Sequence, residues 1–120
     1  MDEAVQQALA NDRLIDITTT GRKSGEARRL EIWFHNLDDG IYITGRPGPR
    51  SWYANLLAKP EFTLHVKESA SADLAARATA VTDETKRREV LTQVIARLDG
   101  DQDIEAWMSG APLVHVEFTG

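Results

Sequence analysis

Alternating apolar and polar positions along the chain predict six β-strands. In residues 14–20 the β-branched side chains of Ile15, Ile17 and Thr19 alternate with side chains that would face the opposite side. This spacing of two residues is typical of a strand with one buried face. The same reasoning predicts strands at 28–35, 41–45, 62–67, 72–81 and 113–118. The fifth of these segments is rich in alanine, so its composition alone would also allow a helix.

A spacing of three to four residues between apolar side chains predicts helices at 3–10, 50–58 and 82–98. The last is the clearest, because Thr82 or Asp83 can cap it and acidic residues lie early. Its apolar stripe consists of Val90, Leu91, Val94, Ile95 and Leu98. Ser51 is the expected N-cap of the helix at 50–58, and Pro60 prevents that helix from continuing. Residues 99–112, a segment that begins with several acidic side chains, are expected to form a loop or a short helical turn.

Hairpins and short connections join most of the predicted strands. The Asp39-Gly40 pair between two of them is a hairpin signal, because glycine tolerates a positive φ. Successive strands are therefore expected to pair antiparallel, with the helices outside them. These patterns predict an α+β fold, a small antiparallel barrel with flanking helices, in a single domain spanning residues 1–120.

Composition narrows the function mainly by exclusion. The absence of cysteine excludes thiolate nucleophiles and cysteine-ligated metals. A net charge of −5 argues against general binding to nucleic acid, which requires a broadly basic face. No segment is apolar enough to span a membrane, and the first residues do not resemble a signal peptide, so a cytoplasmic protein is expected.

Residues 18–29, TTTGRKSGEARR, place the cationic side chains of Arg22, Lys23, Arg28 and Arg29 around two glycines. The segment does not match a phosphate-binding P-loop, because Arg22 occupies the position of the glycine before the Lys-Ser pair. A glycine-bounded turn can instead direct successive backbone N–H groups at an anion, and the cations would add charge-assisted hydrogen bonds. The alternative is a solvated turn whose charges only keep the protein in solution.

Candidate catalytic groups are few. The three histidines, His35, His65 and His115, are widely separated and are interpreted as structural residues with satisfied hydrogen bonds, so no metal site is expected. No serine has an adjacent histidine, and the catalytic residues stay unknown. If the protein is an enzyme, a bound organic cofactor is expected to carry the chemistry. The aromatic side chains near the basic turn could face a flat cofactor or could simply pack in the core.

Two motifs in this order, TTTGRKSG and WYANLLAKP, resemble the deazaflavin-dependent nitroreductase and quinone reductase family of actinobacteria. The resemblance covers roughly residues 14–98. It implies a split β-barrel like that of pyridoxamine-phosphate oxidase. It also implies binding of coenzyme F-420, an 8-hydroxy-5-deazaflavin with an acidic tail, and hydride transfer to a small electron-poor substrate such as a quinone, enone or nitro compound. A homodimer is the expected assembly.

The resemblance also assigns residues to the cofactor. The tail would lie on Arg22, Lys23 and Ser24, with Arg28 or Arg29, and the ring would lie on the loop at 45–50 and the helix after it. The full set of expected cofactor-binding residues is Arg22, Lys23, Ser24, Arg28, Arg29, Trp33, Gly48, Arg50, Trp52, Tyr53 and Asn55.

Two positions depart from the family pattern. Leu30-Glu31 occupies the place of a usual Thr-Pro pair, and residues 103–118 lack the tyrosine that faces substrate in active nitroreductases. Two alternatives therefore stay open beside the deazaflavin enzyme. One is a non-redox relative that binds fatty acids or lipids, with peripheral membrane contact, and the other is a split-barrel protein that binds flavin mononucleotide (FMN).

Overall fold

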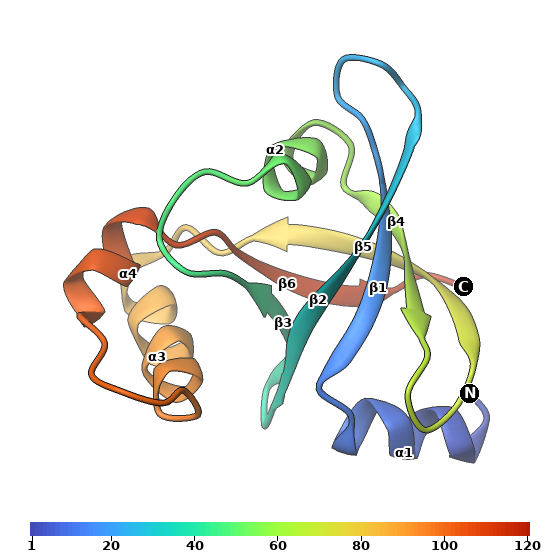
Figure 1. Cartoon of the computed structure of the whole chain (residues 1–120), viewed down its shortest axis with the longest axis horizontal. Helices are drawn as coiled ribbons and strands as arrows, with labels where there is room; N and C mark the ends of the chain where they lie inside the picture. Colours follow the sequence, from blue (N-terminus) through green and yellow to red (C-terminus); the bar gives the residue numbers. More distant parts are fainter.

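The computed structural model describes all residues from 1 to 120 as a closed six-stranded barrel with four helices around it (Figure 1). The strands are β1 (Leu14–Thr20), β2 (Ala27–Leu37), β3 (Gly40–Thr44), β4 (Glu61–Val66), β5 (Ala72–Ala80) and β6 (Leu113–Phe118). The helices are α1 (Glu3–Asn11), α2 (Ser51–Ala58), α3 (Glu84–Ile95) and α4 (Ile104–Gly110). Strands follow one another around the barrel in the order β1-β2-β3-β6-β5-β4, and every neighbouring pair is antiparallel. The predicted α+β barrel is confirmed.

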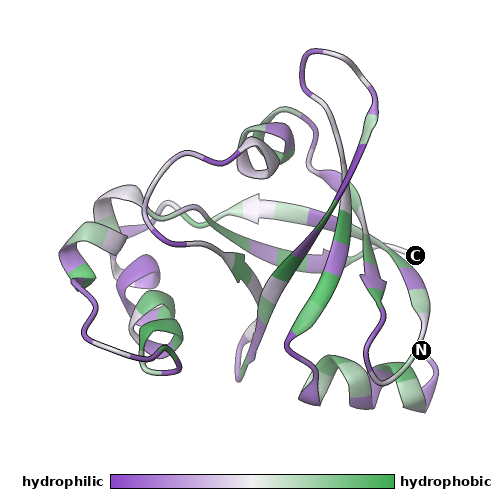
Figure 2. Ribbon diagram, viewed as in Figure 1, coloured by the Kyte–Doolittle hydropathy of each residue, from purple (hydrophilic) through white to green (hydrophobic).

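The alternation along each strand fills the inside of the barrel. On β1, Ile15 and Ile17 are at most 1% exposed, and they lie opposite Val66 and Leu64 of β4. Figure 2 shows the resulting alternation of hydrophobic and hydrophilic residues along the strands. Full burial of each such side chain contributes ~1.5–3 kcal/mol to folding, so the barrel is a stable base for the loops at its ends.

Two helices share the apolar core of the barrel. Val5 and Leu9 of α1 and Trp52 and Leu56 of α2 belong to the same buried cluster as the strand residues. In Figure 1, α1 lies at the lower end of the barrel and α2 lies at the upper end, beside the loop between β1 and β2. The packing of Trp52 and Leu56 therefore fixes α2 next to the basic turn.

The other two helices form a second apolar cluster on the outside of the barrel. Val90, Leu91 and Val94 of α3 and Trp107 of α4 pack with residues such as Leu113 of β6. These helices lie together on one side of the molecule, next to β3 and β6 (Figure 1). None of the four helices combines the length and the apolar character needed to cross a membrane.

Two expectations about the helices need correction. Arg50, and not Ser51, occupies the N-cap position of α2, and its side chain makes no capping hydrogen bond because it turns back onto its own loop. The acidic segment after α3 contains a full helix, α4, whose N-cap Asp103 accepts a hydrogen bond from the Glu105 amide. Trp107 anchors this helix in the second cluster, and that tertiary contact decides between loop and helix.

Candidate functional site

The basic turn is the tip of the hairpin formed by β1 and β2, and it projects beyond the end of the barrel (Figure 1). The Gly21 amide donates to the Glu26 carbonyl and the Gly25 amide donates to the Gly21 carbonyl, both at 2.8 Å. A Cβ at Gly21 would lie 2.5 Å from Ser24 Oγ and 3.3 Å from the Glu26 carbonyl oxygen, so Ser24 would have to move to admit a side chain. Gly25 has a φ of 72°, which favours glycine. The two glycines therefore allow a tight turn that presents its cations at the tip.

Asn55 of α2 connects this turn to the helix. Its Oδ1 accepts a hydrogen bond from the Arg22 amide at 3.0 Å, and its Nδ2 donates to Thr19 Oγ1 at 3.2 Å. The side chain is only 5% exposed, so both hydrogen bonds are largely shielded from water. Asn55 thus holds the backbone of the turn in register with α2.

A pocket of about 470 Å³ lies between the turn and α2. It is lined by Thr19, Gly21, Arg22, Lys23, Ser24, Arg28, Arg29, Leu30, Ser51, Trp52 and Asn55. Seven of the eleven expected cofactor-binding residues are therefore brought together, and none of the lining residues is acidic. The expected set did not include Thr19, Gly21, Leu30 and Ser51, although Thr19 and Gly21 lie within the first motif and Ser51 directly precedes the second. This pocket, named the basic pocket below, suits an anion.

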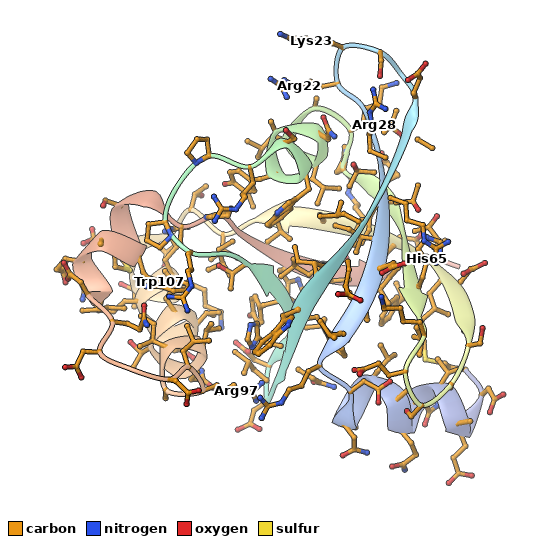
Figure 3. All side chains as sticks on the ribbon, viewed as in Figure 1. Arg22, Lys23, Arg28, His65, Arg97 and Trp107 are labelled. Atoms are coloured by element: carbon orange, nitrogen blue, oxygen red, sulfur yellow. The ribbon has the colours of Figure 1, made fainter.

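The four cations of the basic pocket are not equally available. Arg28 lies 3.3 Å from Glu26, and Arg29 lies 2.9 Å from Asp16. Hydrogen bonds from Lys67 and Arg29 hold the pKa of Asp16 below its ordinary value, although its partial burial opposes this effect. No such carboxylate lies next to Arg22 or Lys23, and Figure 3 shows both side chains pointing outward at the tip of the turn. Arg22 and Lys23 are thus the cations free to meet a ligand.

Backbone donors add to this charge. The amides of Gly21, Arg22, Gly25 and Glu26 all have acceptors within the chain. Those of Lys23 and Ser24 have none. Two successive free N–H groups between cationic side chains are the arrangement that binds phosphate or carboxylate oxygens in protein loops.

A second depression of about 540 Å³ lies on the other side of α2, and Gly48 and Tyr53 are part of its lining. Trp52, in the basic pocket, and Tyr53 are neighbouring rings with centroids 5.9 Å apart in an edge-to-face arrangement. Gly48 has a φ of 133°, and its amide donates to the Gly110 carbonyl of α4. Arg50 donates to the carbonyls of Pro49 and Arg46 and so stiffens the loop. The two depressions therefore flank one short helix.

Trp33 lies outside both depressions. It is part of a third cavity at the opposite end of β2, together with Arg13, His35 and Arg97. Figure 3 shows Arg97 at the lower end of the molecule and Arg22, Lys23 and Arg28 at the upper end. The structure thus separates Trp33 from the other expected cofactor-binding residues.

Two of the histidines differ in their hydrogen bonding. His65 has both ring nitrogens engaged, at 2.7 Å from Thr18 Oγ1 and 2.7 Å from Asp73 Oδ1. This pair of contacts links β1, β4 and β5 on the outer face of the barrel, and it agrees with the interpretation of a structural histidine. His35 is 5% exposed, makes no side-chain hydrogen bond within the chain and lines the cavity that contains Trp33.

Comparison with known proteins adds a family and a fold. The family model described as F-420H(2)-dependent quinone reductase matches residues 3–114. A solved F-420 reductase is 20% identical, with a TM-score of 0.70 over 100% of this chain and 97% of that one. The haem storage protein HutZ from Vibrio cholerae is 13% identical, with a TM-score of 0.73 over 97% and 88%. An FAD-binding protein from Mesorhizobium loti is 13% identical, with a TM-score of 0.69 over 100% and 91%. At these identities the solved structures establish the split-barrel fold alone.

Proposed function

Because the chain belongs to the F-420H(2)-dependent quinone reductase family, we propose that it binds coenzyme F-420 and transfers a hydride between it and a small electron-poor molecule. Quinones, enones and nitro compounds are the substrate classes that fit this chemistry. The observation that carries the proposal is the basic pocket, where free amides and uncommitted cations face a space without acidic residues.

The residues present fit the two ends of such a cofactor. Arg22, Lys23 and the amide of Ser24 would hold the acidic tail, with Arg28 and Arg29 at the far wall of the basic pocket. Trp52 and Asn55 would border the ring on one side of α2. Gly48 and Tyr53 line the separate depression on the other side of α2, where Arg50 holds the loop in shape, and their contact with the cofactor stays a prediction.

When bound, the deazaflavin supplies the hydride chemistry, and the protein contributes binding, orientation and electrostatics. Asn55 keeps the Arg22 amide and Thr19 in fixed positions beside α2. The buried Trp52 keeps the wall of the pocket rigid, since it is packed in the barrel core. A rigid wall holds bound molecules in a defined geometry, and this positioning lowers the barrier of a reaction between them.

The composition of the basic pocket disfavours the lipid-binding alternative. A fatty acid would need a long apolar groove beside its charged head group. Only Leu30 and Trp52 of the eleven lining residues are hydrophobic. We therefore favour a polar, anionic cofactor, with FMN as the competitor because it also carries a phosphate.

Titration with coenzyme F-420 and with FMN tests the cofactor assignment. We expect F-420 to bind more tightly, with an affinity that falls as salt is added because the tail contacts are ionic. Arg22→Ala and Lys23→Ala should each weaken binding by ~1–3 kcal/mol, which is the worth of a charge-assisted hydrogen bond. Asn55→Ala should also change the absorbance spectrum of the bound deazaflavin.

Arg77→Ala is the matched control. Arg77 pairs with Glu61 on the surface, so this variant removes the same positive charge at a place away from the pocket. It should leave the affinity unchanged. A preference for FMN would keep the fold and overturn the cofactor. Failure of quinones, enones and nitroaromatics to oxidise the bound reduced deazaflavin faster than the protein-free rate would overturn the reductase assignment.

We further propose that the chain forms a homodimer, as the resemblance to the family implies. Leu57 is 58% exposed on α2, and it is a suitable apolar contact for a second copy. Sedimentation equilibrium should give twice the monomer mass, and Leu57→Glu should shift the mass towards the monomer. A strict monomer at high protein concentration would contradict this proposal.

A further inference from the structure

The cavity that contains Trp33 is separate from the basic pocket and has a different chemistry. Its volume is about 310 Å³. Three parts of the chain meet there: Arg13 in the connection between α1 and β1, Trp33 and His35 on β2, and Arg97 just after α3. The cavity lies at the opposite end of the molecule from Arg22 and Lys23, as the position of Arg97 in Figure 3 shows.

His35 is the first sign that this cavity binds something. The residue is 5% exposed, lines the cavity and makes no side-chain hydrogen bond within the chain. The ring nitrogens are not among the fully buried atoms without a partner, so they are open to the cavity and can hydrogen-bond to a molecule inside it. Burial, with Arg97 and Arg13 nearby, lowers the pKa of His35 to about 4, so the ring is neutral at pH 7 and offers one N–H donor and one acceptor.

The charged groups around the cavity favour an anion. Arg13 has no carboxylate partner, and its guanidinium lies 6.0 Å from the centre of the Trp33 ring. Arg97 makes a single long hydrogen bond, 3.4 Å, to the Asn36 carbonyl. The acidic residue in the lining is Asp12, and both of its oxygens already accept hydrogen bonds from Ser69. Two guanidinium groups with free donors therefore face the space.

The size and the aromatic wall define the body of the ligand. Trp33 is 47% exposed, which is unusual for a large aromatic side chain on a small barrel. Its ring offers a flat face next to the cations, whereas the volume admits a single-ring compound and is too small for a dinucleotide-sized cofactor.

From these observations we propose that the cavity binds a small aromatic carboxylate, with the carboxylate between Arg13 and Arg97 and the ring against Trp33. The neutral His35 ring donates its N–H to the same carboxylate. Nothing in this proposal depends on the cofactor assigned to the basic pocket. A carboxylate beside His35 also offsets the repulsion from the two arginines, so the pKa of His35 rises in the complex.

The experiment is an NMR titration of the full chain with benzoate, following the indole N–H of Trp33 and the ring signals of His35. We expect saturable shifts of both, and a rise in the titration midpoint of His35 when benzoate is bound. Benzamide, which lacks the charge, and acetate, which lacks the ring, should each bind at least about tenfold more weakly, because each loses one of the two recognition elements.

Arg97→Gln should weaken benzoate by roughly tenfold or more, and Arg13→Gln is the second variant should the first fail to fold. Arg22→Gln in the basic pocket is the matched control and should bind benzoate as the wild type does. The proposal is overturned if benzoate shifts neither Trp33 nor His35, for example because a second copy of the chain covers the cavity. It is overturned equally if acetate binds as tightly as benzoate, or if Arg22→Gln removes the binding.

Discussion

Replacing Arg87 with methionine is expected to destabilise the protein by ~3 kcal/mol. The Arg87 guanidinium donates hydrogen bonds to four carbonyl oxygens, those of Val81, Trp107, Met108 and Ala111, at 2.9–3.2 Å. Two of these carbonyls belong to the last turn of α4, which has no basic residue of its own to satisfy them. Methionine keeps the apolar stem of arginine but leaves these acceptors without a charged donor. Three of the four contacts share the single nitrogen Nη2, so they do not add up, and the total is taken as that of one strong hydrogen bond from a charged group, ~3 kcal/mol.

Arg88→Met is the matched control, one residue away on the same helix. Arg88 pairs with Glu105 on the surface, where ion pairs contribute ~0–1 kcal/mol. Urea denaturation followed by tryptophan fluorescence measures both variants, since Trp107 reports directly on α4. Equal losses for Arg87→Met and Arg88→Met would contradict the role assigned to Arg87.

Arg87 also links stability to the proposed site. Its hydrogen bonds hold the end of α4, and the Gly110 carbonyl at that end accepts from the Gly48 amide. Gly48 in turn belongs to the loop that lines the second depression beside Tyr53. We therefore expect Arg87→Met to weaken cofactor binding as well, while Arg88→Met leaves it unchanged.

The neighbouring pair Arg87 and Arg88 shows a limit of reading the sequence alone. Both lie in one charged run of α3, and no local pattern distinguishes them. Which of the two faces the carbonyl groups depends on the rotation of α3 against α4. That rotation is set by Val90, Leu91 and Trp107 in the second cluster. The stripe of Val90 and Leu91 was predictable, but its packing partner was not.

The strands were more predictable because each carries its own signal. The two-residue spacing of Ile15, Ile17 and Thr19 requires only that one face of β1 is buried, and all three are buried. Asn55 is an intermediate case. Its motif indicated the site, but its bonds to the Arg22 amide and Thr19 join segments more than 30 residues apart.

Trp33 shows how distance along a strand misleads. Trp33 lies four positions after Arg29 in the sequence, so both were predicted to belong to one cofactor site. Four residues of extended chain span ~13 Å, because a strand rises ~3.3 Å for each residue. Trp33 consequently lies in another cavity, whereas Asn55, much farther away in sequence, contacts the basic turn directly.

Lowering the pH from 7 to 4 is expected to reduce the free energy of unfolding by ~3 kcal/mol through His35 alone. Burial is the main reason that its pKa falls from 6.5 to about 4, and the positive charges of Arg97 and Arg13 add to it. Between these two pH values the unfolded chain takes up a proton that the folded protein excludes. Stability is therefore greatest above pH 6.5 and is lost as the pH falls towards 4, at ~1.4 kcal/mol for each pH unit.

The His35→Gln variant isolates this effect, because glutamine is neutral at every pH and His35 makes no hydrogen bond that would be lost. The charged and titratable groups around the ring are Arg13, Asp12 and Arg97, with Tyr42 opposite it on β3. All four remain in the variant. Urea denaturation at several pH values should show the variant close to the wild type at pH 7 and more stable than it at pH 4.

Arg97→Gln should raise the NMR titration midpoint of His35, since it removes a repulsive charge. A midpoint near 6.5 in the wild type, or the same acid sensitivity in His35→Gln, would show that the ring is not held neutral by its surroundings. The partner sought for it in the third cavity would then be unnecessary.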